Sequence, residues 1–138
     1  MALTCLLDTS VITRLSVDGV RARVGQLVVD FDRVARASIS DLEVGFSARN
    51  AAEFDTIVGA LDPFELVEIE PRHFRRALQV QRLLADRGLR GRKVPDLLIA
   101  AAAESQTMTV VHYDADFDHI STITGQPASW VVPPGTID

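Results

Sequence analysis

The chain has 138 residues, is 47% hydrophobic, carries a formal net charge of −5 and contains one cysteine, Cys5. This length and composition predict a single domain over residues 1–138 with a buried core, and they exclude a low-complexity chain. No apolar run approaches the roughly 20 residues needed to span a bilayer, and no secretory leader is recognisable. A lone cysteine excludes an internal disulfide. We therefore expect a cytoplasmic protein without a membrane partner.

Strands and helices are expected to alternate along the chain, because the spacing of apolar residues switches between the two periods. The expected strands are LTCLLD (3–8), RASIS (36–40), FELVEIE (64–70), TMTVVHYD (107–114) and ASWVVP (128–133). The expected helices cover 19–34, 40–49, 50–61, 71–88 and 95–105, with a helical turn at 116–122. Ser40 and Glu43 match a capping box, which predicts that a helix begins there. Such alternation is typical of a parallel sheet with helices on both faces.

Five acidic residues lie where strands end or where the following helices begin. Asp8 and Asp114 end expected strands, and Asp116 follows two residues after Asp114. Glu43 and Asp96 lie in the first turns of helices. Ligands of open parallel sheets bind beyond the carboxyl ends of the strands, and all these positions share that edge. Each acid alone is also explained as the cap of a turn or a helix.

A cluster of these carboxylates is harder to explain by capping. Carboxylates about 5 Å apart repel by roughly 3 kcal/mol per pair at an effective dielectric of 20, whereas a cap contributes about 1 kcal/mol. A cluster therefore requires a cation that neutralises it, or members that stay protonated. Oxygen ligands without Cys or His favour Mg²⁺, or Mn²⁺, over zinc.

Four stretches in this order, LLDTSV, SDLEVG, VPDLLIAAAA and VVHYDADFDHI, resemble the motifs of PIN-domain ribonucleases, and most closely those of the VapC-type toxins of bacterial toxin–antitoxin pairs. The resemblance covers essentially the whole chain and implies a PIN-like three-layer α/β/α fold, with a central, mainly parallel sheet of about four to five strands flanked by helices. By position, it implies catalytic acids at Asp8, Glu43, Asp96 and Asp114, metal ligands at Asp8, Asp96, Asp114 and Asp116, and a supporting hydroxyl at Thr9 or Ser10. The family often has Thr two residues before the last catalytic acid, where this chain has His112.

The same resemblance implies a function. The protein would be a Mg²⁺-dependent endoribonuclease, with Mn²⁺ as an alternative cofactor, that hydrolyses RNA phosphodiester bonds. It would act as the toxin of a VapBC-type pair, be inhibited by a cognate VapB-type antitoxin and form a homodimer. An apolar N-terminal surface of Val11, Ile12 and Leu15 with the helix over 19–34 is the expected contact for the antitoxin.

A basic block lies between Arg72 and Lys93, with eight cations and a single acid, Asp86, for a net charge of +7. Its cations are Arg72, Arg75, Arg76, Arg82, Arg87, Arg90, Arg92 and Lys93. Although a solvated helix face explains any one of them, the block is expected to bind RNA phosphates beside the acids. The five site acids account for the whole net charge of −5, so the acidic balance does not argue against RNA.

Two other families have a first strand or a site that resembles the first motif, but each requires a residue that this chain lacks at the required position. A phosphatase of the haloacid dehalogenase type needs a second Asp two residues after Asp8, where Ser10 stands. A receiver domain needs a lysine after a late strand, but the only lysine, Lys93, precedes Asp96. A PIN-like module that binds RNA or protein without cutting remains the alternative.

Overall fold

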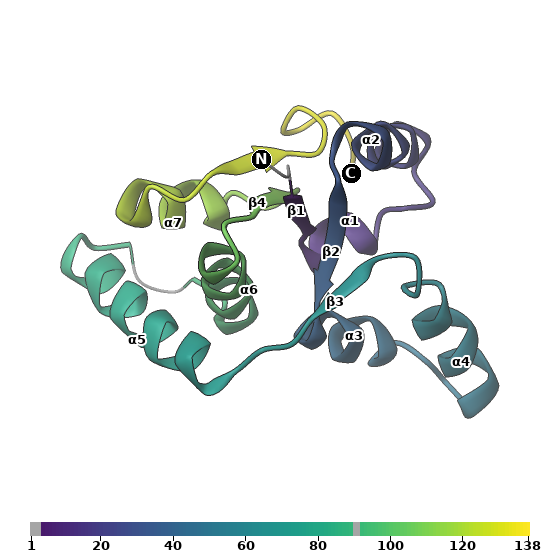
Figure 1. Cartoon of the computed structure of the whole chain (residues 1–138), viewed down its shortest axis with the longest axis horizontal. Coiled ribbons are helices and arrows are strands. Elements are labelled where there is room, and N and C mark those ends of the chain that lie inside the picture. The colour runs from purple at the N-terminus through teal and green to yellow at the C-terminus, as the bar shows by residue number, and fades with distance from the viewer. Residues whose placement is uncertain (1–3, 90–91) are drawn as a thin grey trace.

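The computed structural model describes residues 4–89 and 92–138, which contain a five-stranded sheet with parallel pairing throughout (Figure 1). The strands are β1 (Thr4–Leu7), β2 (Arg33–Ala37), β3 (Glu65–Val67), β4 (Thr109–His112) and β5 (Ala128–Trp130). Their order across the sheet is β3-β2-β1-β4-β5. The predicted parallel sheet is thus confirmed.

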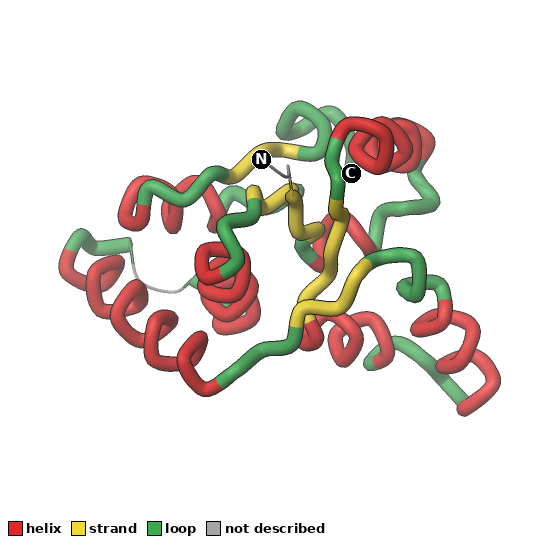
Figure 2. The backbone as a smooth tube through the Cα atoms, viewed as in Figure 1, coloured by secondary structure: helices red, strands yellow, loops and turns green. Residues whose placement is uncertain are grey.

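Helices connect the strands, as the tube in Figure 2 shows. Those in the described residues are α1 (Thr9–Ile12), α2 (Asp18–Asp30), α3 (Ser38–Gly45), α4 (Ala51–Gly59), α5 (Pro71–Asp86), α6 (Val94–Ser105) and α7 (Asp116–Thr124). Within the same residues, none of these helices has the length and apolar character needed to cross a membrane.

Two apolar layers cover the two faces of the sheet, because successive side chains of a strand point in opposite directions. Leu6 of β1 packs with residues of α5, α6 and α7, among them Leu84 and Phe117. Its neighbours Cys5 and Leu7 pack on the other face, in the cluster that holds the buried residues of α1 and α2. This is the three-layer α/β/α arrangement that the resemblance implied.

The boundary between the first long helix and the second strand differs from the prediction. The helix expected over 19–34 ends at Asp30, and Val34 belongs to β2, where it pairs with Cys5 of β1. Val34 fits the helical spacing only by coincidence, because pairing with the central strand determines its conformation.

The capping box predicted at Ser40 and Glu43 was also wrong. The strand expected over 36–40 ends at Ala37, and α3 begins at Ser38, so Ser40 lies inside the first turn of the helix. Ser40 is fully buried and contacts the hydroxyl of Thr9, and α3 has no side-chain cap. Glu43 therefore lies in the second turn of α3, where it accepts from the Thr9 hydroxyl rather than closing a cap.

The strand order places a topological switch point beside β1. From β1 the chain moves outward to β2 and β3, and it later returns on the other side of β1 to form β4 and β5. Parallel sheets leave a crevice at the carboxyl ends of the strands where the direction reverses. Here that crevice lies beyond the ends of β1 and β4, and the acids of the first and last motifs follow these two strands.

Candidate metal centre

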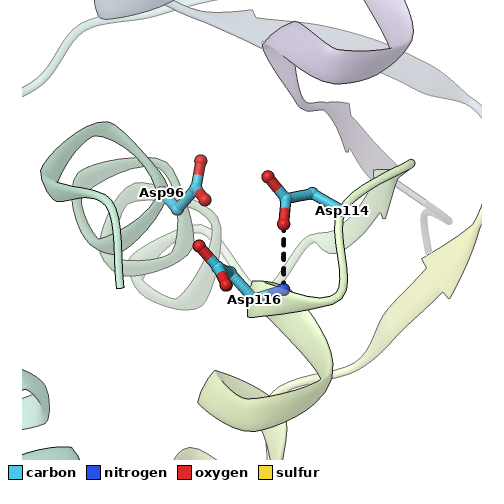
Figure 3. Close-up of side chains that lie close together, drawn as sticks. All are labelled: Asp96, Asp114 and Asp116. Carbon is cyan, nitrogen blue, oxygen red and sulfur yellow. Dashed lines mark hydrogen bonds between the residues drawn. The ribbon is translucent and has the colours of Figure 1, made fainter. Parts of the chain in front are cut away.

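The acids predicted from the sequence meet at this edge of the sheet. Asp8 directly follows β1, and Asp114 lies two residues beyond β4. Asp96 lies in the first turn of α6, and Asp116 begins α7. One carboxylate oxygen from each of Asp96, Asp114 and Asp116 lies within 4.8 Å of the other two (Figure 3). Two separate segments of the chain, the start of α6 and residues 114–116, therefore contribute to this cluster, and Asp8 lines the same cavity as Asp96 and Asp114.

A cavity of about 220 Å³ opens onto the cluster, and four acids line it: Asp8, Glu43, Asp96 and Asp114. Asp8 is 2% exposed and Asp96 is 5% exposed, so these two form the deep part of the cavity. Glu43 comes from α3 and is exposed. Asp116 reaches the cluster from α7, where its backbone N–H donates to Asp114 Oδ1 at 3.0 Å (Figure 3).

Ser10 holds the carboxylate of Asp8 and links it to the end of β4, the strand beside β1 in the sheet. The Ser10 backbone N–H and hydroxyl donate to Asp8 Oδ2 at 3.0 and 2.5 Å. The same hydroxyl accepts the backbone N–H of Tyr113 at 2.9 Å. Because Tyr113 immediately precedes Asp114, Ser10 fixes the ends of β1 and β4 relative to each other.

Thr9 makes the corresponding contact with Glu43. Its hydroxyl donates to Glu43 Oε1 at 2.7 Å and lies 2.8 Å from the hydroxyl of buried Ser40. This bond connects α1 to α3 and leaves the second carboxylate oxygen of Glu43 for other partners. Both hydroxyls singled out in the sequence thus contact acids of the cavity.

His112 orients the backbone ahead of Asp114. The ring is fully buried, and its Nδ1 accepts the backbone N–H of Asp114 at 3.2 Å. It stacks on Phe117 and lies against Trp130, each with a ring-centroid distance of 5.0 Å. Burial lowers the pKa of His112, which keeps the ring neutral and Nδ1 able to accept. A buried imidazole therefore orients this segment without the hydroxyl that is frequent in the family.

Each of the two deepest acids has a carboxylate oxygen that accepts no hydrogen bond from the described residues. Among the described residues, neither Asp8 Oδ1 nor Asp96 Oδ2 has a hydrogen-bond partner, although both are buried. Burial, followed by the charges of Asp8 and Asp114, raises the pKa of Asp96 to about 8. Burial also raises the pKa of Asp8, against the hydrogen bonds from Ser10. Oxygen atoms of this kind suit a hard divalent cation, which would replace the missing donors.

Two cations from the segment before α6 enter the cluster. The Lys93 ammonium donates to Asp114 Oδ2 and lies 3.8 Å from Asp96 Oδ2. Arg92 Nη1 donates to Asp116 Oδ1 at 2.9 Å. Although burial acts to raise it, the pKa of Asp114 is lowered, because Lys93 and the N–H of Asp116 donate to its carboxylate. The cluster is therefore partly neutralised by the chain itself.

The rest of the basic block is spread along α5 and its carboxyl end. Arg72 pairs with Glu70 and Arg76 with Glu104, at 2.7 Å each. Arg75, Arg82 and Arg87 are exposed. Arg90 lies outside the described residues. Among the members that the structure describes, Lys93 alone lines the cavity.

The cavity also has a wall that the sequence analysis did not assign, formed by Thr13, Arg14 and Tyr113. Arg14 comes four residues after Ser10, which is one turn of a helix, and Arg14 Nη1 donates to the Ser10 carbonyl at 2.8 Å. No helix was predicted between the strand over 3–8 and the helix over 19–34, so α1 was missed. A helix beginning after Asp8 would have placed Arg14 above Ser10.

Comparison with known proteins agrees with this fold and site. The PIN domain family matches residues 5–123. Ribonuclease VapC51 of Mycobacterium tuberculosis H37Rv is 58% identical over 138 residues, which is 100% of both chains. Ribonuclease VapC21 of the same strain is 42% identical over 133 residues, covering 95% of this chain and 96% of its own.

Solved structures show the same fold at low sequence identity. VapBC2 from Rickettsia felis, bound to a DNA fragment from its promoter, matches with a TM-score of 0.77 and 16% identity, over 93% of this chain and 98% of that one. DNA-bound VapBC from Salmonella typhimurium matches with a TM-score of 0.75 and 20% identity, over 96% and 100%.

The fold and the acidic cluster at the carboxyl edge of the sheet are those of a PIN domain. The chain belongs to the PIN-domain family and, within it, to the VapC ribonucleases. The family match ends at residue 123, before β5, which pairs with β4 in the same sheet. That one domain spans residues 1–138 remains a prediction.

Proposed function

We propose that this protein is a Mg²⁺-dependent endoribonuclease that acts as the toxin of a VapBC-type pair and is inhibited by a cognate VapB-type antitoxin. The observation that carries the proposal is the pair of buried oxygens on Asp8 and Asp96 that have no hydrogen-bond partner within the described residues, next to the carboxylates of Asp114 and Asp116. Leaving such groups unneutralised at the switch point of a parallel sheet is costly, and a ligand cation offsets that cost.

Asp8, Asp96, Asp114 and Asp116 would hold the cation, which we propose to be Mg²⁺, with Mn²⁺ as an alternative. An all-carboxylate set matches the preference of both ions for oxygen. When bound, the ion supplies positive charge that polarises a phosphoryl oxygen and makes a water molecule more acidic. Ser10 keeps Asp8 in position, and the hydrogen bond from Asp116 N–H fixes Asp114.

Glu43 is proposed to accept a proton from the attacking water. It lines the cavity from α3, and Thr9 holds its Oε1 by the 2.7 Å hydrogen bond, so the carboxylate is oriented before substrate arrives. Lys93 is proposed to bind a phosphoryl oxygen. With a divalent cation held by Asp114, the Lys93 ammonium would lose this partner and would be available to donate to a phosphate of the RNA.

The exposed arginines of α5 would follow the RNA backbone away from the cavity. Arg75, Arg82 and Arg87 make no ion pair among the described residues, in contrast to Arg72 and Arg76. Flexible surface cations of this kind add affinity that is independent of sequence and depends on salt. Arg92 stays with Asp116 in this arrangement and would support the cluster.

A homodimer is proposed through the surface between α5, α6 and α3. Two apolar grooves of about 200 and 240 Å³ adjoin there and share Phe74 and Leu98. Leu42, Phe74 and Leu78 are 76%, 53% and 65% exposed on this surface. A second copy would bury this apolar area, which monomers rarely leave exposed. The antitoxin surface expected at the N-terminus needs revision, because Val11 and Ile12 are buried in the core.

The proposal is tested by incubating the purified protein with total cellular RNA in Mg²⁺, with and without chelator, and mapping the new ends. Cleavage should require the cation and should be lost in Asp8→Asn. The matched control is Asp18→Asn, which removes an exposed carboxylate on α2 and should cut like the parent. RNA that is bound but not cut under all conditions would favour the non-cleaving module, and undiminished cleavage by Asp8→Asn would remove that residue from the site.

A further inference from the structure

Two cations from the described part of the chain line the cavity, and of these two only Lys93 contacts the acidic cluster. Lys93 lies against Asp114, whereas Arg14 lies on the wall formed by Tyr113 and the residues that follow α1. Three groups hold the Arg14 guanidinium in one position. Nη1 donates to the Ser10 carbonyl at 2.8 Å, and the guanidinium carbon lies 5.2 Å from the centroid of the Tyr113 ring.

The third group is the carboxylate of Asp138. Arg14 Nε lies 3.1 Å from both of its oxygens, and Nη2 donates to Oδ2 at 2.8 Å, so the two side chains form a forked pair. The Asp138 side chain is 53% exposed and that of Arg14 28%. Because the Asp138 carboxylate is half-exposed, solvent reaches the pair from that side and weakens it, and another anion can compete for the guanidinium.

Tyr113 brings Asp138 to this position. Its hydroxyl accepts the backbone N–H groups of Gly135 and Ile137 at 3.0 and 3.3 Å, and it donates to the Ile137 carbonyl at 2.8 Å. The segment 133–138 is therefore anchored on the same ring that lies under Arg14. Because Tyr113 immediately precedes Asp114, this arrangement is attached directly to the strand end that carries the acids.

We propose that Arg14 is a phosphate-binding residue for the RNA strand that enters the cavity, and that Asp138 occupies it in the RNA-free protein. The proposal rests on the ribonuclease function proposed above. Carboxylate and phosphate present similar pairs of oxygens to a guanidinium, so an RNA phosphate can take the place of Asp138 without moving Arg14. The contacts to Ser10 and Tyr113 keep the guanidinium oriented during the exchange. Asp138 thus lowers the affinity for RNA, because its carboxylate competes with an RNA phosphate for the Arg14 guanidinium.

The test measures binding of a fluorescein-labelled single-stranded RNA by anisotropy, in an Asp8→Asn background that prevents cleavage. Asp138→Asn should tighten binding about two- to five-fold, which corresponds to the loss of one exposed competing ion pair. Arg14→Gln should weaken binding, and the slope of log Kd against log salt concentration should become shallower by about 0.7, the value for one phosphate contact on a single strand. In the Arg14→Gln background, Asp138→Asn should no longer tighten binding.

Two variants on α2 provide matched controls, because Arg21 and Asp18 form an exposed pair there at 2.5 Å. Asp18→Asn removes the same charge as Asp138→Asn, and Arg21→Gln the same charge as Arg14→Gln, so both should leave the affinity and the salt slope nearly unchanged. A thermal melt of each variant confirms folding, and Arg14→Lys keeps the charge without the fork and should bind with intermediate affinity.

The proposal is overturned if Asp138→Asn tightens binding equally with and without Arg14, or if Arg14→Gln leaves the salt slope unchanged. It is also wrong if Arg14→Gln weakens only the complex with the antitoxin. These outcomes leave the ribonuclease proposal intact, because the parent protein still binds and cuts RNA. A parent protein that binds no RNA would overturn both proposals.

Discussion

Replacing Asp96 with Asn should remove a pH dependence of stability from the metal-free protein. Burial and the charges of Asp8 and Asp114 raise the pKa of Asp96 from 3.8 to about 8. The folded state therefore binds a proton that the unfolded chain has released. The stability that this proton contributes is complete below about pH 4 and is lost as the pH rises through about 8, so the free energy of unfolding falls over this range.

One proton that differs between the two states changes the free energy of unfolding by about 1.4 kcal/mol per pH unit. Because Asp96 begins to ionise in the folded state near its pKa, we expect a loss of about 1 kcal/mol between pH 7 and 8. Asp8, whose pKa burial also raises, acts in the same direction. The buried histidines His73 and His112 have lowered pKa values, so their effect is of opposite sign but falls mainly below their ordinary value of 6.5.

The assay is urea unfolding at several pH values from 7 to 8 in the presence of chelator. The parent protein should lose stability across the range, and Asp96→Asn should lose distinctly less. Asp18→Asn, an exposed acid on α2, should follow the parent. Equal slopes for the parent and Asp96→Asn would refute the account of a buried, proton-binding carboxylate at this position.

Three further predictions concern the cation, the fold and the dimer. Millimolar Mg²⁺ or Mn²⁺ should raise the melting temperature of the parent, because an ion that binds only the folded state stabilises that state. The melting temperature of Asp96→Asn should rise less, and equal rises would argue against a cation site at the acidic cluster. Arg36→Met should destabilise the fold by about 3 kcal/mol in urea unfolding, because buried Arg36 binds Asp41 and the carbonyls of Leu61 and Phe64. Arg33 lies on the same strand as Arg36 but forms an exposed pair with Glu65 of β3, so Arg33→Met should lower the free energy of unfolding much less. Equal losses of stability in the two variants would contradict this difference in burial. Phe74→Glu should yield monomers in light scattering while Val29→Glu, an equally polar change on exposed α2, should not; a Phe74→Glu dimer would exclude the α5–α6 surface.

The motif acids and the sheet could be predicted because they depend on short-range patterns. Apolar runs that end in an acid indicated β1 and β4, and parallel strands leave their ends at one edge. The apolar segment of α6 was equally clear, since Leu97 to Ala103 are all buried and only Asp96 carries charge on its buried side. The resemblance of the four motifs to those of PIN domains implied that these acids meet, whereas the order of the strands was not predicted and comes from the structure.

The features that were missed depend on contacts between distant segments. The helix α1 has only four residues and no periodic signal, so neither it nor the position of Arg14 could be read from spacing. The pairing of Arg14 with Asp138 joins residues 124 positions apart, and Tyr113 mediates it through its hydroxyl. The start of α3 was misplaced because Ser40 resembles a cap, while its actual partner is Thr9 of the distant first motif.

The basic block ends at Lys93, and after it the chain has six acidic residues and no Lys or Arg. This change of charge has a structural reason. The segment that delivers Asp96 to the cavity also delivers Arg92 and Lys93, which bind Asp116 and Asp114. The cluster can therefore fold before any ion binds, because its counter-charges arrive with it. In the function proposed above, Lys93, which lines the cavity, would exchange Asp114 for an RNA phosphate once a cation is held by the carboxylates. The same side chain would then neutralise the acids in the ion-free protein and bind the substrate in the complex.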